Sequence, residues 1–205
     1  MGRVAVVGYA AAMDPARKLH TYADLEALDE GVRAEIIGGN LETLPSPLPR
    51  HSRAQRSLSR QLGGPLDDDD GFGGPGGWWI LLEVDVELSS HDIVQPDLSG
   101  WRRVRLPEPD VRPIRVIPDW VCEISSPSTA QRDRVVKSRL YAESGVPFYW
   151  LVDPDARTLE ALELSNGRWL DVGRWTDLEI APVPPFEAVE LDLRKLFLPK
   201  QATPT

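Results

Sequence analysis

Residues 120–152 read WVCEISSPSTAQRDRVVKSRLYAESGVPFYWLV, and this stretch decides the fold. Residues 120–125 predict a strand, residues 127–144 predict a capped helix that ends at Gly145, and the continuous apolar run 148–152 is typical of a strand buried on both faces. A strand, a helix and a second strand form a βαβ unit, so at least part of the sheet must be parallel. The stretch therefore predicts an α/β fold.

Further elements surround this unit. Gly38 and Gly39 supply the positive φ angles that a tight hairpin needs, which places Glu35 on the first hairpin strand. On the second predicted helix, four arginines at spacings of 3, 3 and 4 residues gather on one face. The other predicted elements are a short helix starting at Thr21 and ended by Gly31, hairpin strands 32–37 and 40–44, the second helix at 50–62, and strands 78–88, 93–101 and 158–164.

The domain organisation follows from these elements. Residues 20–198 are expected to form a single domain, preceded by a lead-in, 1–19, that is either disordered or an extra strand, and followed by a loose tail, 199–205. Within the domain, residues 63–77 hold seven glycines, two prolines and the run Asp67 to Asp70. Such a stretch cannot bury apolar area, so it predicts a surface loop.

The charge is distributed unevenly along the 205 residues. The net charge of -9 argues against a protein that coats nucleic acid or an anionic membrane by bulk attraction. Residues 61–100 hold nine Asp or Glu and no Lys or Arg, whereas residues 50–60 carry four arginines and no acid, and residues 101–140 carry nine basic and five acidic side chains. A local basic groove is therefore compatible with the total.

The cellular setting is read from what the sequence lacks. Cys122 is the only cysteine, which excludes a disulfide framework and a thiolate metal cluster and favours a reducing cytoplasm. No segment approaches 18 consecutive apolar residues, so no membrane association is expected.

Three carboxylates on predicted strands suggest a shared site: Glu35, Asp97 and Glu123. An ionised carboxylate inside an apolar strand is costly unless a cation compensates it, and Mg²⁺ or Mn²⁺ with oxygen ligands is the economical partner. The alternative is that Glu123 ends its strand in solvent or pairs with Arg132 or Arg134.

Lys137 is set apart by the scarcity of lysine. The chain has 19 arginines and four lysines, and between residues 19 and 194 every other basic position is arginine. A lysine ammonium is a compact charge suited to orienting water or stabilising a phosphate. The alternative is an ordinary i, i+4 pair with Asp133 on an exposed helix face.

Together, these motifs resemble the bacterial Uma-type putative restriction endonuclease family, a branch of the PD-(D/E)xK nuclease superfamily. The resemblance covers residues 20–195 and is most specific from Glu123 to Pro154. The segments that carry it are Tyr22 to Leu25, Ala34 to Gly39, Ser46-Pro47 with Arg50-His51, Gln95 to Leu98, Glu123 to Thr129, Asp133 with Lys137, and Tyr141 with Gly145 to Pro154.

The resemblance implies a restriction-endonuclease-like core, in which helices flank a mixed central β-sheet. Asp97 and Glu123 would hold the metal, and Glu35 would be the acid that the superfamily contributes from an N-terminal helix or the following strand. Ser125 stands two residues after Glu123, where the superfamily signature has lysine, and Lys137 is the matching lysine on the next helix. The positions that match the family without a defined role, and that we expect to contact substrate or support the site, are His51, Gln95, Ser125 and Asp133.

The implied activity is Mg²⁺- or Mn²⁺-dependent hydrolysis of phosphodiester bonds, with DNA as the expected substrate and Asp97, Glu123, Lys137 and Glu35 as the catalytic set. The alternatives are an inactive nuclease-fold binding module, or a hydrolase of RNA or another phosphate ester. A homodimer is expected because double-strand cleavage commonly uses two sites. The side chains expected to contact the phosphate backbone are Arg53, Arg56, Arg102 and Arg103.

Overall fold

The computed structural model describes residues 18–68, 74–126 and 129–200. Most of the expected lead-in and tail, part of the acidic run, and the capping residues Pro127 and Ser128 lie outside them. The elements in chain order are α1 (Tyr22–Glu26), β1 (Ala34–Ile37), β2 (Asn40–Thr43), α2 (Pro49–Leu66), β3 (Trp78–Leu81), β4 (Val86–Ser89), β5 (Asp92–Val94), β6 (Leu98–Arg102), β7 (Trp120–Ile124), the π-helix η1 (Arg132–Lys137), α3 (Ser138–Ser144), β8 (Phe148–Asp153), β9 (Thr158–Ser165), β10 (Arg168–Thr176), β11 (Ile180–Pro182), β12 (Glu190–Asp192) and the 3₁₀ turn η2 (Leu193–Lys195).

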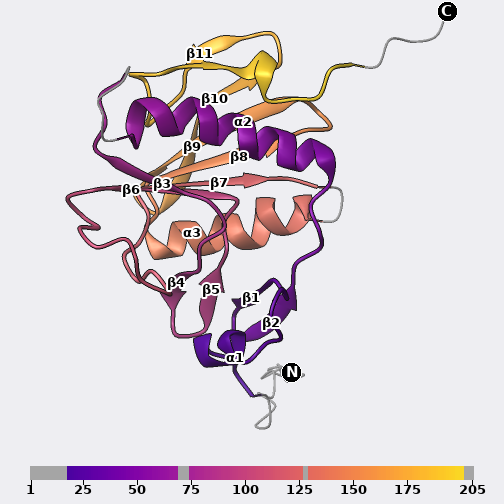
Figure 1. Ribbon diagram of the computed structural model, residues 1–205, viewed down its shortest axis with the longest axis vertical. Coiled ribbons are helices and arrows are strands. Elements are labelled where there is room, and N and C mark those ends of the chain that lie inside the picture. The colour runs from indigo at the N-terminus through magenta and orange to yellow at the C-terminus, as the bar shows by residue number, and fades with distance from the viewer. Residues whose placement is uncertain (1–17, 69–73, 127–128, 201–205) are drawn as a thin grey trace, which may run out of the picture.

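A mixed sheet of six strands forms the centre of the fold (Figure 1). Its order is β10-β9-β8-β7-β6-β3. β7 pairs with β8 in parallel, and all other neighbouring strands in this sheet are antiparallel. The parallel pair is the one joined by η1 and α3, which confirms the βαβ unit predicted from residues 120–152.

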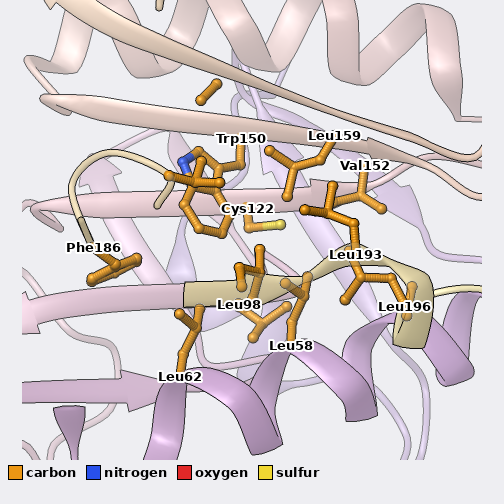
Figure 2. Packing of buried hydrophobic residues seen from close by; sticks show 14 of the residues in the cluster. Leu58, Leu62, Leu98, Cys122, Trp150, Val152, Leu159, Phe186, Leu193 and Leu196 are labelled. Carbon is orange, nitrogen blue, oxygen red and sulfur yellow. The ribbon is translucent and has the colours of Figure 1, made fainter. Parts of the chain in front are cut away.

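Helices cover both faces of this sheet, with α2 on one side and η1 with α3 on the other (Figure 1). Because side chains alternate along a strand, Trp120 and Cys122 of β7 join the core beneath α2, whereas Val121 and Glu123 face the α3 side. The core beneath α2 also contains Leu58 and is closed by residues of the C-terminal segment, including Phe186, Leu193 and Leu196 (Figure 2). The α/β architecture, with a mixed sheet between helices, is as predicted.

A second, four-stranded sheet of order β2-β1-β5-β4 corrects two strand predictions. Residues 78–88 and 93–101 were each predicted as one strand, but each bends from one sheet into the other. The first bend spans 82–85, where Glu83 has a positive φ of 51°. The second is Gln95-Pro96-Asp97, where Pro96 provides no backbone N–H for a strand ladder.

The N-terminal hairpin confirms the expected turn chemistry. Gly38 and Gly39 have φ angles of 55° and 74° between β1 and β2, and Glu35 lies on β1. The helix α1 spans only five residues and is therefore shorter than predicted, although Thr21 is its N-cap and donates its backbone N–H to Asp24 Oδ2 at 2.9 Å.

The second helix is longer than predicted, because it continues through Gly63, Gly64 and Pro65 to Leu66. Leu62 and Leu66 are both buried in the core, and this burial offsets the poor helix propensity of the residues between them. The expected loop at 63–77 therefore begins after Leu66. None of the described helices is both long enough and apolar enough to cross a membrane.

Candidate active site

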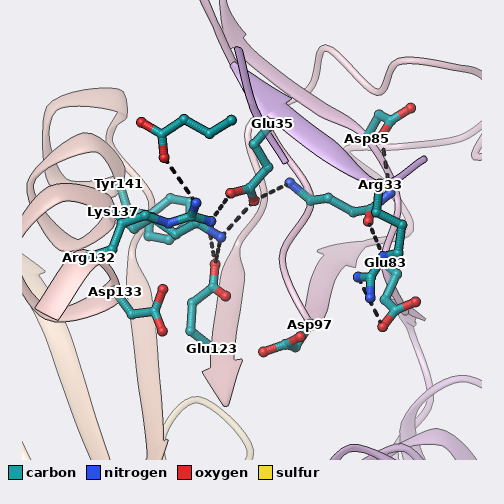
Figure 3. A network of polar contacts seen from close by, with 12 residues as sticks. Arg33, Glu35, Glu83, Asp85, Asp97, Glu123, Arg132, Asp133, Lys137 and Tyr141 are labelled. Atoms are coloured by element: carbon teal, nitrogen blue, oxygen red, sulfur yellow. Dashed lines mark hydrogen bonds and ion pairs between the residues drawn. The ribbon is translucent and has the colours of Figure 1, made fainter. Parts of the chain in front are cut away.

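Three acids and one lysine predicted to share a site come together beside the end of β7 (Figure 3). Glu35 comes from β1, Asp97 from the bend between β5 and β6, Glu123 from β7 and Lys137 from the last position of η1. All four side chains are buried or nearly so. The fold thus brings together residues that are up to 102 positions apart in the sequence.

Lys137 joins two of the carboxylates. Its Nζ lies 2.6 Å from Glu35 Oε1 and 2.9 Å from Glu123 Oε1, and the side chain is 3% exposed. The alternative of an exposed pair with Asp133 is therefore wrong. Glu123 is likewise buried and not paired with either arginine, because Arg132 pairs with Glu35 and Glu42 and Arg134 pairs with Glu160.

Asp97 is fixed by two different donors. Its Oδ2 accepts the backbone N–H of Ile124 at 2.6 Å, which holds the carboxylate against the strand that carries Glu123. Its Oδ1 lies 3.0 Å from His51 Nε2, and His51 sits in the first turn of α2. His51 thus contacts the expected metal-binding acid directly.

The π-helix η1 places side chains that an α-helix would separate. Arg132 and Lys137 are five residues apart, which on an α-helix would put them about 140° apart around the axis. In η1 both reach Glu35, because Arg132 Nη2 also forms an ion pair with Glu35 Oε2, and its Nη1 lies 3.1 Å from Glu42 Oε2. Single-turn π-helices frequently occur at functional sites.

Sequence reasoning missed the roles of Arg132 and Tyr141. Tyr141 is fully buried and donates its hydroxyl to Glu123 Oε1 at 2.6 Å. It lies one helical turn after Lys137, so the i, i+4 spacing could have identified it. Arg132 was considered only as a partner of Glu123, and nothing in the local pattern signals a π-helix.

The electrostatics of this cluster are unbalanced. Its buried carboxylates are Glu35, Asp97, Glu123 and Asp133, and its permanent cations are Lys137 and Arg132. Burial, together with the neighbouring acids Asp133, Asp97 and Glu35, raises the pKa of Glu123 to about 8 against the opposing attraction of Lys137. Burial alone would lower the pKa of Lys137, but Glu123 and Glu35 outweigh it, so this pKa is raised and the lysine stays charged.

Asp97, Glu123, Asp133 and Lys137 of this cluster line a pocket of about 90 Å³. The proline-rich segment 44–48 that leads into α2 also lines this pocket. The residues that line the pocket are Arg33, Leu44, Pro45, Ser46, Pro47, Leu48, His51, Gln95, Asp97, Glu123, Ile124, Ser126, Thr129, Arg132, Asp133 and Lys137.

Of the remaining expected site residues, two line the pocket and one does not. Gln95 and Asp133 line the pocket, and the backbone N–H of Gln95 donates to Glu35 Oε1 at 2.8 Å. Burial raises the pKa of Asp133, although Lys137 opposes this. Ser125 is buried and donates its backbone N–H to Val152 O at 2.8 Å, but it is not among the pocket-lining residues.

The arginines expected to contact phosphate lie outside the pocket. Arg53 and Arg56 lie on α2, where Arg53 is half-buried and Arg56 exposed, and the guanidinium groups of Arg102 and Arg103 stack over Trp78 and Trp79 at 4.1 and 3.9 Å. Arg103 also pairs with Asp67, just beyond the end of α2, whereas His51 is in its first turn. An 18-residue helix is about 27 Å long, so Arg103 is far from the carboxylates.

The donor set fits a hard divalent cation. No group of three or more His, Cys, Asp or Glu side chains placed to share an ion occurs within residues 18–68, 74–126 and 129–200. Asp97 and Glu123 nevertheless present carboxylates to one pocket, and Mg²⁺ is usually held by one or two carboxylates together with water. Four buried carboxylates face two permanent cations, so added positive charge would stabilise the cluster.

A mixed sheet between helices, with acids and a lysine gathered at the end of a central strand, defines the class of restriction-endonuclease-like proteins. The chain belongs to the Uma2 family, described as "Putative restriction endonuclease", which matches residues 19–194.

The fold also resembles a solved structure. This is the crystal structure of a putative nuclease belonging to DUF820 from Anabaena variabilis ATCC 29413, which superposes with a TM-score of 0.68 at 23% sequence identity. The match covers 86% of this chain and 97% of the other. A comparison with curated proteins finds no match. The family supports a nuclease, and the solved structure shows that the fold is shared.

Tyr141 gives a prediction about the stability of this site. We expect Tyr141→Phe to lower the free energy of unfolding at pH 7 by about 0.5–1.5 kcal/mol, because it removes a buried hydrogen bond to the Glu123 side chain while keeping the ring. Urea denaturation followed by circular dichroism measures this change. A difference from the wild type below about 0.5 kcal/mol would show that the hydroxyl does not support Glu123.

Proposed function

We propose that this protein is a Mg²⁺- or Mn²⁺-dependent endonuclease that hydrolyses phosphodiester bonds in DNA. The observation that carries the proposal is the pocket lined by Asp97, Glu123 and the charged, buried Lys137, in which Asp97 is hydrogen-bonded to the strand that carries Glu123. Membership of the Uma2 family, described as "Putative restriction endonuclease", supports the same chemistry. A homodimer in the cytoplasm, with two such sites, would account for cleavage of both strands.

Asp97 and Glu123 would hold the metal ion. When bound, the ion would polarise the scissile phosphate and lower the pKa of a bound water. The protein's own groups prepare the site for this. The Ile124 N–H and His51 orient Asp97, and the Tyr141 hydroxyl orients Glu123.

Lys137 would act on the reacting phosphate directly. Its ammonium remains charged inside the pocket, so it can stabilise the negative charge that develops in the transition state or orient the attacking water. Glu35 and Arg132 form the support behind it, since Glu35 contacts both cations. Glu35 thereby limits where the ammonium can lie.

Contacts to the DNA backbone would extend from the pocket along α2. Arg53 and Arg56 lie on this helix, and Arg102 and Arg103 lie near its far end. Because phosphates on one strand repeat about every 3.4 Å along the axis, the length of α2 corresponds to about eight base pairs. These contacts would position the duplex without reading its sequence.

Nicking of supercoiled plasmid in Mg²⁺ or Mn²⁺, with EDTA as the control, tests the proposal. We expect metal-dependent conversion of supercoiled to open-circular plasmid that weakens as salt is raised, because phosphate contacts are salt-sensitive. Parallel assays with single-stranded RNA and with a simple phosphodiester distinguish the substrate classes. Binding of DNA without hydrolysis under every metal condition would instead indicate an inactive binding module.

A further inference from the structure

The bends between the two sheets determine where Asp97 lies. Glu35 belongs to the four-stranded sheet and Glu123 to the six-stranded sheet, while Asp97 stands at the bend that joins them (Figure 3). The two bends, 82–85 and 95–97, lie on neighbouring strand pairs, β3 with β6 and β4 with β5. The angle at these bends therefore decides whether the three acids meet.

Glu83 occupies the first bend in an unusual backbone conformation. Its φ of 51° lies in the left-handed region, which a residue with a Cβ rarely adopts. Such conformations persist only where surrounding contacts impose them, and they cluster at functional sites. Glycine would adopt this φ without strain, but the chain has a glutamate at position 83.

The contacts of Glu83 tie both bends to the site. Its backbone N–H donates to Pro96 O at 3.2 Å, which links the two bends directly. Its Oε1 accepts from Gln55 Nε2 at 3.1 Å and lies 3.2 Å from Arg33 Nη2. Gln55 Nε2 also donates to Asp97 O at 3.1 Å, so one amide connects Glu83 to the backbone of the metal-binding acid.

Arg33 extends the same connection to the other sheet. Its Nε donates to Gln95 Oε1 at 3.0 Å, and the Gln95 backbone N–H donates to Glu35 Oε1. The carboxylate of Glu83 is thus connected to Asp97 through Gln55, and to Glu35 through Arg33 and Gln95. Glu83 does not line the active-site pocket.

From this geometry we infer that Glu83 is a positioning residue, whose carboxylate fixes the angle between the two sheets and so aligns Asp97 with Glu35 and Glu123. The inference rests on the proposed nuclease function for its effect on rate. It does not require that Glu83 touch substrate. A merely structural role would instead affect stability alone.

Two variants separate the side chain from the backbone strain. Glu83→Gly removes the side chain but suits the positive φ, so we expect the melting temperature to be unchanged or raised. We expect kcat for plasmid nicking to fall about 100-fold with little change in KM, because small displacements of catalytic groups have effects of this size. Glu83→Gln keeps the shape of the side chain and one acceptor oxygen. Its kcat should therefore fall by about 10-fold less than that of the glycine variant.

A second measurement does not depend on activity. The chain has three histidines, so their ring nitrogens can be assigned in ¹H–¹⁵N spectra. We expect the signals of His51, which lies 3.0 Å from Asp97, to shift in Glu83→Gly, while those of His20 and His91 stay unchanged. Asn166→Gly is the matched control, because Asn166 also has a positive φ, 49°, but lies in the turn between β9 and β10.

The outcomes separate the two proposals. Wild-type kcat and wild-type His51 signals in Glu83→Gly would overturn the positioning role. If the wild-type protein shows no metal-dependent hydrolysis of any substrate, the proposed function fails, and the His51 signals alone then decide whether Glu83 aligns Asp97.

Discussion

Glu123→Gln is expected to reduce the rate of metal-dependent plasmid nicking by about 10³-fold or more. The amide keeps the size of the side chain but removes the charge and one carboxylate oxygen of a proposed metal ligand. Lewis-acid stabilisation of the transition state is worth several kcal/mol, and each 1.36 kcal/mol corresponds to a factor of ten. Single-turnover nicking rates at saturating Mn²⁺ measure the loss.

Glu160→Gln is the matched control for this variant. Glu160 is likewise a strand carboxylate paired with a basic side chain, in its case Arg134, but it lies on β9 and outside the pocket. We expect its nicking rate to be that of the wild type. Equal rates for the wild type and the Glu123→Gln variant would remove Glu123 from the catalytic set.

The same variant should change how stability depends on pH. Because the pKa of Glu123 is raised from 4.5 to about 8, the folded protein retains a proton that the unfolded chain has released between these pH values. The contribution of Glu123 to stability in EDTA is therefore fully present below pH 4.5 and is lost as pH rises through about 8, by up to about 1.4 kcal/mol per pH unit. Glu123→Gln should flatten this dependence, whereas Glu160→Gln should not, because the pKa of Glu160 is lowered by its bond to Arg134.

The elements whose conformation depends on neighbouring residues in the sequence were predicted correctly. The Gly38-Gly39 hairpin turn and the βαβ unit of 120–152 are both present, because turn conformation and hydrophobic periodicity are set by nearby residues. The strands 78–88 and 93–101 were predicted without their bends. An alternating pattern continues unchanged when a strand passes from one sheet to another, and only Pro96 marks either bend.

The site likewise contains residues that the sequence predicts and residues whose contacts depend on an unpredicted backbone conformation. Asp97, Glu123, Lys137 and Glu35 were assigned from motif order, and the structure gathers them. The contacts of Arg132 and Glu83 depend on a π-helix and on a left-handed residue, and neither conformation has a recognisable sequence signal here. The strands β10 to β12 were also not predicted. They form from a segment with mostly exposed or half-exposed residues, where periodicity is weak.

Lys137→Met is expected to lower both activity and stability. Methionine fills a similar volume in the buried position but leaves Glu35 and Glu123 without their shared cation. Breaking a buried ion pair by removing one partner typically costs about 3–5 kcal/mol. Even with Glu123 protonated, Glu35, Asp97 and Asp133 would then face only Arg132, so we expect a loss within this range in urea denaturation at pH 7.

A control and a double variant identify the cause of this loss. Lys195→Met removes an exposed lysine that pairs with Asp192, and it should cost less than about 1 kcal/mol. Combining Lys137→Met with Glu35→Gln removes, together with the cation, the carboxylate that lies 2.6 Å from it, so the double variant should be more stable than Lys137→Met alone. Additive destabilisation would show that packing, and not charge, is what Lys137 contributes to the fold. Nicking should stay at least about 10³-fold below wild type in both Lys137 variants, because neither restores an ammonium beside the phosphate.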